Sequence, residues 1–210
     1  MNRRFIGGVL AFFLSSCSVL DNPSLKTFSH VLPSFGGKRA IGKVDPNYRY
    51  LKVKFRGQAG FLASSNQYSD PEQTWFSSAG EVLVIQDGRL REALGMVVEW
   101  RRVVLPKLPA WGDLAKSGKP FEWTRIRDVM QGYRYGVKDR LILQRIPAPD
   151  KSEYDGDPGR LIWFRETDLA GNPLPPSRYA YDPAKNRIVY GETCLSDDFC
   201  FSWQEWRGGQ

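Results

Sequence analysis

The sequence predicts an all-β fold, either an antiparallel β-barrel or a strongly curved half-barrel with little helix. Three observations support this class: short runs that alternate between apolar and polar residues, turn-forming dipeptides between the runs, and no regular alternation of strands with helices. Because a long open sheet exposes its edges, curling or closing it removes them. The 210 residues, 41% hydrophobic and 25% charged, are enough to enclose a core.

Residues 1–16 have the pattern of a bacterial lipoprotein signal peptide. Arg3 and Arg4 precede an apolar run at residues 5–14, which is shorter than the about twenty residues of a membrane-spanning helix. The following Leu14-Ser15-Ser16-Cys17 resembles a lipobox, in which small residues fit a peptidase cleft and the cysteine carries the lipid. The sequence therefore predicts cleavage before Cys17 and lipidation of its thiol.

The predicted mature chain has two parts, a tether at residues 17–45 and a single β-barrel-like domain at residues 46–210. The tether is rich in Ser, Pro, Gly and Lys. Ser18 stands where an inner-membrane retention signal has Asp, so we expect a lipid anchor in the outer membrane, on its periplasmic side. Removal of residues 1–16 takes away two arginines and no acidic residue, which lowers the formal net charge from +7 to +5.

The first predicted strand is residues 48–56, where Leu51, Val53 and Phe55 alternate with basic side chains. Short runs follow, and Asp87-Gly88 between two of them is a strong type I′ hairpin signal. These runs predict strands at residues 60–65, 73–77, 81–86 and 89–93.

The middle of the chain is compatible with more than one structure. Residues 97–105 fit a strand or a helix, and Pro106 ends the element in either case. Residues 111–117 fit one or two helical turns, and residues 147–159 a polar loop. The remaining predicted strands are residues 121–129, 133–146, 160–167, 178–181, 187–190 and 200–206.

Cys194 and Cys200 flank a polar loop at residues 195–199. Export places them in an oxidising compartment, and lipidation of Cys17 leaves them as an even pair. The spacing is not C-x-x-C, so a structural disulfide is favoured over a redox-active pair.

Several classes of chemistry lack the residues that they need. The single histidine, His30, lies in the predicted tether, which leaves no histidine-based triad or metal helix in the folded region. The acidic segment at residues 155–159 fits a turn and lacks the spacing of a calcium loop. Positive charges are interspersed with negative ones, so no nucleic-acid partner is expected. We expect no metal and no cofactor.

Aromatic residues make up 13% of the chain, and several of its seven tryptophans lie within two residues of an arginine. Sugar rings stack on indoles while arginines bind hydroxyl or acidic groups, so this composition suits a glycan-binding groove. The same tryptophans also suit the core of a β-barrel. Both interpretations stay open at the level of the sequence.

Residues 75–96 (WFSSAGEVLVIQDGRLREALGM) resemble the signature stretch of the YjbF/GfcB family, lipoproteins encoded with exopolysaccharide and group-four capsule genes. Trp123-Thr124 and residues 132–136 are similar to the middle segment of that family, and residues 181–190 to its late hairpin. The long segment at residues 97–119 and the cysteine pair depart from its pattern. The resemblance implies a barrel-like periplasmic lipoprotein that supports production or export of a surface polysaccharide. It supplies no catalytic residues.

The expected function is therefore non-enzymatic: a lipoprotein that assists exopolysaccharide export by binding the glycan or a protein of the export machinery. The candidate contact residues are aromatic or basic: Trp75, Arg89, Trp123, Arg134 and Tyr135. One alternative is a carrier that holds a lipid or lipoprotein in an apolar lumen. The other is a polysaccharide-modifying enzyme with a carboxylate pair, for which the sequence offers Glu99, Glu122, Asp128 and Glu166.

The substitution Cys17→Ala is expected to release the protein from membranes, because the acyl chains attached to that thiol hold it there. Cell fractionation with immunoblotting measures the distribution, and incorporation of labelled palmitate measures lipidation. A Ser18→Ala variant is the matched control and keeps the label. A Cys17→Ala variant that stays labelled and sediments with membranes would contradict the assignment.

Overall fold

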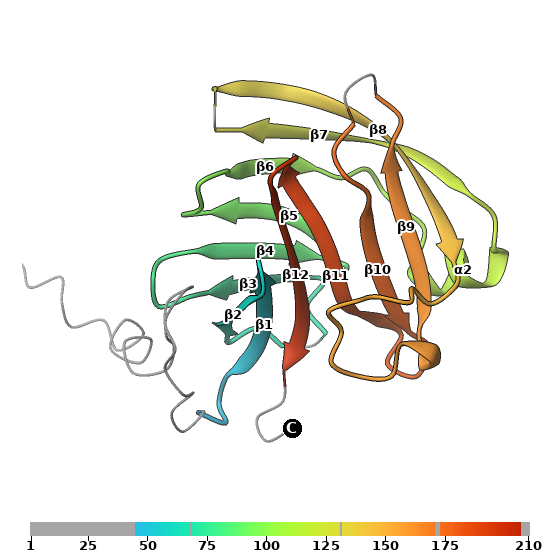
Figure 1. Cartoon of the computed structure of the whole chain (residues 1–210), viewed down its shortest axis with the longest axis horizontal. Coiled ribbons are helices and arrows are strands. Elements are labelled where there is room, and N and C mark those ends of the chain that lie inside the picture. Colours follow the sequence, from blue (N-terminus) through green and yellow to red (C-terminus); the bar gives the residue numbers. More distant parts are fainter. Residues whose placement is uncertain (1–44, 68, 131, 171–172, 207–210) are drawn as a thin grey trace, which may run out of the picture.

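A computed structural model describes residues 45–67, 69–130, 132–170 and 173–206; the predicted signal peptide, Cys17 and His30 lie outside these ranges. Within them the chain forms twelve β-strands, one α-helix and one 3-10 helix (Figure 1). The strands of the first half are β1 (Arg49–Phe55), β2 (Gln58–Ser64), β3 (Glu72–Phe76), β4 (Val82–Gln86), β5 (Arg89–Leu94) and β6 (Trp100–Val104). After α2 (Trp111–Ser117) come β7 (Phe121–Val129), β8 (Arg134–Ile146), η1 (Pro158–Arg160), β9 (Ile162–Asp168), β10 (Ser177–Asp182), β11 (Arg187–Ser196) and β12 (Phe199–Trp206).

The strands form one antiparallel sheet that closes in a ring, which confirms the predicted fold class. Each strand pairs with its neighbours in the sequence, and β1 pairs with β12 from Tyr50↔Trp206 to Phe55↔Phe201. The shortest seams in the described residues are β2–β3 and β5–β6, where single Cα pairs are recorded. The ring therefore removes the edges that an open sheet of this size would expose.

Alternation and turn chemistry account for the early strands. In β1, Leu51 and Val53 point into the core, whereas Lys52 and Lys54 lie on the outer face. Asp87 and Gly88 both have positive φ, as a type I′ turn requires. The preceding hairpin uses Arg56 and Gly57 in the same way.

The structure resolves the ambiguous middle segment as strand β6 followed by helix α2. The C-cap Gly118 has φ +60°, and its N–H donates to the carbonyl of Leu114, which ends the helix. Strand β11 is longer than the predicted residues 187–190, because its pairing with β12 continues to Ser196. The predicted 195–199 loop is thereby reduced to a short turn.

The inside of the ring is filled with side chains. Its core cluster combines large aromatic and aliphatic residues from all twelve strands, including Trp75, Trp100, Phe164 and Trp203. At Gly191 a Cβ atom would lie 2.3 Å from Cζ2 of Trp203, so only glycine leaves room for that indole. The interior is therefore a packed core built around tryptophan.

Helix α2 covers one end of the ring, at the end where β7 begins (Figure 1). The ring of Trp111 lies 5.2 Å from that of Phe164 and 5.3 Å from that of Tyr179, measured between centroids. Its indole N–H donates to the carbonyl of Asp87 at 2.6 Å. Trp111 thus ties the helix to the β4–β5 turn and to the core.

The polar loop between β8 and β9 packs against the outer face of the sheet. Asp155 accepts hydrogen bonds from Lys52 and Lys54 at 2.7 and 2.9 Å and from the amide of Gln204 at 2.6 Å. Partial burial acts to raise the pKa of Asp155, but the two lysines outweigh it and hold the pKa below its usual value. This acidic segment consequently anchors the loop to the sheet.

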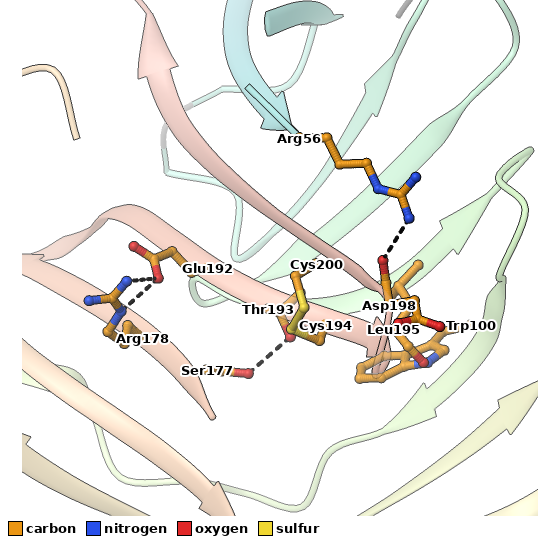
Figure 2. Close-up of a disulfide and its surroundings, with 10 residues drawn as sticks. All are labelled: Arg56, Trp100, Ser177, Arg178, Glu192, Thr193, Cys194, Leu195, Asp198 and Cys200. Carbon is orange, nitrogen blue, oxygen red and sulfur yellow. Dashed lines mark hydrogen bonds and ion pairs between the residues drawn. A yellow bond between two sulfur atoms is a disulfide. The ribbon is translucent and has the colours of Figure 1, made fainter. Parts of the chain in front are cut away.

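A disulfide joins Cys194 and Cys200, as the sequence predicts. The two residues are paired across β11 and β12, next to the turn at residues 197–198. Figure 2 shows Arg56 pointing to the backbone of Asp198 on this turn, and Trp100 beneath it. Trp100 donates from its indole to the carbonyl of Leu195 at 3.1 Å.

The double variant Cys194→Ala/Cys200→Ala is expected to lose about 2 kcal/mol of unfolding free energy, because a short loop in the unfolded chain is no longer closed. Urea unfolding in oxidising buffer measures the loss. Wild-type protein with dithiothreitol is the matched control and is expected to show the same midpoint. Equal stability of the oxidised wild type and the double variant would contradict a stabilising role for the bond.

Candidate functional site: a buried arginine and its cavity

Charged side chains lie inside the barrel on β5, β7, β8 and β9. We call Arg89, Arg125, Arg127, Asp139 and Glu166 the interior ion cluster; each is at most 5% exposed. Strands β7 and β8 place Arg125 opposite Asp139, and alternation puts Arg127 on the same inward face. Buried charges are stable when they are paired, and both β7 arginines are paired with Asp139.

Asp139 receives hydrogen bonds from both β7 arginines. Arg125 Nε donates to its Oδ2 at 2.8 Å, and Arg127 donates from Nε at 2.6 Å and from Nη2 to Oδ1 at 3.0 Å. Both guanidinium groups also lie over Trp100, with Cζ 4.5 and 4.8 Å from the ring centroid. Burial acts to raise the pKa of Asp139, but the hydrogen bond from Arg127 and the two positive charges hold the pKa below its usual value.

Glu166 has longer contacts in the same cluster. Its Oε1 lies 3.7 Å from Nη1 of Arg125 and accepts a hydrogen bond from the hydroxyl of Tyr179 at 3.4 Å. Its Oε2 has no hydrogen-bond partner among the described residues. Burial raises the pKa of Glu166 above its usual value, against the attraction of Arg125 and Arg89. The two interior carboxyl groups therefore have pKa values displaced in opposite directions.

Arg89 lies close to two indoles at the covered end of the barrel. Its Cζ is 3.8 Å from the centroid of Trp111 and 5.9 Å from that of Trp123. Arg89 is 4% exposed, and its Nε and Nη2 have no hydrogen-bond partner in the part of the chain that the structure describes. Burial lowers the pKa of Arg89, opposed by the negative charge of Glu166.

Arg89 also lines a cavity of about 390 Å³, which we call the Arg89 cavity. One wall is the segment from β6 to α2, residues 105–111, which includes Pro106, Pro109 and Trp111; the other lining residues are Gln86, Asp87 and Asn186. Lys107 is exposed at this wall. The cavity thus combines an apolar wall, a buried guanidinium and exposed groups that can bind hydroxyls.

The structure brings some of the sequence-predicted contact residues together and separates others. Arg89 and Trp123 are neighbours, but Trp123 is buried. Trp75 is buried beneath Arg49 and lines a different cavity of about 220 Å³. Arg134 and Tyr135 are exposed where β8 begins, at the opposite end of the barrel from α2. The five candidates do not form one groove, and their role in binding stays a prediction.

The four candidate catalytic carboxylates are also dispersed. Glu99 accepts hydrogen bonds from Gly95 N–H and Arg101, and Glu122 pairs with Arg140 on the surface. Asp128 accepts from the N–H of Gly136, and Glu166 belongs to the interior ion cluster. The described residues contain no group of three or more His, Cys, Asp or Glu side chains arranged for a metal ion.

Sequence reasoning did not find Lys107, Asn186 or the role of Trp111 in the cavity. Residues 105–111 come close to Arg89 only because the segment after β6 leads to α2 at the end of the barrel, which no local pattern reports. The two prolines and two leucines before Trp111 are the one local signal, since an apolar segment outside the strands must pack against something.

Comparison with known proteins supports the fold and leaves the family open. No protein-family model matches the chain, and no curated protein matches it. Among solved structures, the hypothetical lipoprotein YmcC from Escherichia coli (K12) is similar with a TM-score of 0.54 and 14% sequence identity. The match covers 78% of this chain and 85% of YmcC. At this identity the likeness concerns the fold alone. In the described residues, no helix has the length and apolar character that crossing a membrane requires.

Asp139→Asn is expected to destabilise the protein by about 3–5 kcal/mol, because two buried guanidinium groups lose their shared negative partner. Glu166→Gln is the matched comparison and is expected to cost less than about 1 kcal/mol, since burial already disfavours the ionised carboxyl and the amide keeps an acceptor. Urea unfolding at pH 7 measures both. Equal losses would contradict the different roles assigned to the two carboxyl groups.

The same variants predict opposite dependences on pH. The folded-state pKa of Asp139 is lowered, so its contribution is complete above its unfolded pKa of about 3.9 and is lost as the pH falls. The folded-state pKa of Glu166 is raised, so its ionisation reduces stability as the pH rises from about 4.3. Asp139→Asn should therefore weaken the acid-induced loss of stability, and Glu166→Gln should remove a loss seen on raising the pH.

Proposed function

We propose that this protein is a non-enzymatic lipoprotein, anchored through Cys17 on the periplasmic side of the outer membrane, that assists production or export of an exopolysaccharide or capsule. The lipobox supports the anchor, and the resemblance of residues 75–96 to the YjbF/GfcB family supports the polysaccharide role. The fold likeness to YmcC, a hypothetical lipoprotein, agrees with the anchor.

The Arg89 cavity is the observation that favours glycan binding over a purely structural role. Its volume of about 390 Å³ lies in the range of small-molecule sites, about 300–1,000 Å³. Apolar wall residues suit the faces of sugar rings, and Arg89, Asp87 and Asn186 suit their polar groups. A protein of the export machinery is the other binding partner that the proposal includes.

The carrier alternative receives less support from the interior. A lipid carrier needs an open apolar lumen, whereas tryptophans and the interior ion cluster fill this barrel. An apolar cavity of about 190 Å³ lies at the other end, between Phe55, Met96 and Phe199. It is smaller than the sites that hold drug-sized ligands.

The enzyme alternative also receives less support. The two interior carboxyl groups with displaced pKa values, Asp139 and Glu166, are both bound by Arg125 inside the barrel. Neither lines the Arg89 cavity, so a glycan bound there would not reach them. A general acid and base must contact the bond that they cleave.

Deletion of the gene in the producing strain is expected to reduce the secreted polysaccharide in amount or chain length. Quantification of uronic acid and total sugar, with gel filtration of the secreted polymer, measures both. Expression of the wild-type chain from a plasmid is the control and should restore them. Unchanged polymer under producing conditions would overturn the proposal.

A further inference from the structure

The guanidinium of Arg89 is a buried cation with unused hydrogen-bond donors. Its Nε and Nη2 are inaccessible and have no protein acceptor in the described part of the chain. Burying a donor without an acceptor is unfavourable, and more so for a charged group. Stacking on Trp111 offsets part of this penalty but supplies no acceptor. Arg89 lines the cavity, so a ligand bound there with oxygen acceptors would lie against this guanidinium.

The charges around Arg89 favour a negatively charged ligand. The interior ion cluster has three arginines and two carboxyl groups. The carboxylate of Asp139 already accepts hydrogen bonds from Arg125 and Arg127. Glu166 is the carboxyl group left for Arg89, and burial favours its neutral form. Even with both carboxyl groups ionised, this cluster has one positive charge in excess, and the lining residues Asp87 and Lys107 add one charge of each sign.

The walls of the Arg89 cavity favour an organic anion over a small inorganic one. Leu105, Pro106, Leu108 and Pro109 form an apolar wall that an inorganic ion would not use. Lys107 adds a second positive charge at the rim, and Asn186 offers an amide for hydroxyl groups. The volume of about 390 Å³ exceeds what one small ion requires.

We propose that the Arg89 cavity binds a carboxylate-bearing sugar, such as a uronic acid unit of an acidic polysaccharide. Arg89 holds the carboxylate, residues 105–111 contact the ring, and Lys107 attracts the acidic polymer to the mouth of the cavity. This inference rests on the proposed function and names the class of glycan that the protein recognises.

Titration of the full-length lipidated protein in detergent tests the specificity. The probes are an oligosaccharide that contains glucuronate, a neutral glucose oligosaccharide of equal length, and inorganic phosphate. We expect the acidic oligosaccharide to bind at least about tenfold more tightly than either of the others, with affinity that falls as salt is added. Calorimetry and tryptophan fluorescence provide two readouts. Equal binding of the neutral sugar, equal binding of phosphate, or no binding of the acidic probe would each overturn the inference.

Two exposed lysines provide a matched pair of variants. Lys107→Glu reverses a charge at the mouth of the cavity and is expected to weaken binding of the acidic probe about fivefold. Lys116→Glu makes the same change on helix α2, outside the cavity lining, and should leave the affinity within about twofold. Arg89→Gln should weaken binding at least about thirtyfold. If Arg89→Gln does not fold, the lysine pair decides, and equal affinities for the two lysine variants would overturn the inference.

The two proposals fail in different ways. In one outcome, gene deletion reduces the polysaccharide, a Lys107→Glu chain restores it, and the purified variant binds the acidic probe as tightly as the wild type. This outcome would support the proposed function and overturn the acidic-sugar site. Unchanged polysaccharide on deletion, together with probe binding that depends on Lys107, would overturn the export role and leave the site.

Discussion

The contacts of Trp111 hold the covered end of the barrel together. Its indole N–H fixes the β4–β5 turn through Asp87, its ring packs on Phe164 and Tyr179, and its face supports Arg89. A ring of twelve strands encloses more space than the strand side chains at one end can fill. The helix that carries Trp111 covers this space, and in doing so it creates the Arg89 cavity. The packing of Trp111 that covers this end of the barrel therefore also forms the candidate site.

The interior ion cluster shows how a closed sheet can accommodate charge. In a low-dielectric interior, an arginine is stable where a carboxylate and an aromatic face lie within a few ångströms. Arg125 and Arg127 have both, through Asp139 and Trp100. Arg89 has an aromatic face but a more distant and more easily neutralised carboxyl partner. The proposed role of Arg89 in ligand binding rests on this difference from Arg125 and Arg127.

The sequence predicted most of the strands because local patterns determine them. Alternation in β1 and the Asp87-Gly88 turn needed no tertiary information, and the spacing and compartment of Cys194 and Cys200 predicted their bond. Residues 97–105 were ambiguous because β6 is short and has little recorded pairing with β5. The inward charges of β7 and β8 were not found, since a period-two pattern of arginines looks the same whether it faces water or a buried partner. The Arg89 cavity was only partly found because its walls come from segments that meet across the barrel end.

The pairing of β1 with β12 joins the first strand of the domain to its last. Tyr50 lies opposite Trp206, so this seam closes a loop that contains nearly the whole folded chain. Contacts so distant in sequence slow folding, because the entropy of closing the loop is lost before the contacts form. Synthesis delivers β1 first and β12 last of the twelve described strands. Until β12 arrives, the outer strand β1 has an unpaired edge, and the nascent protein is most vulnerable to misassociation during that interval.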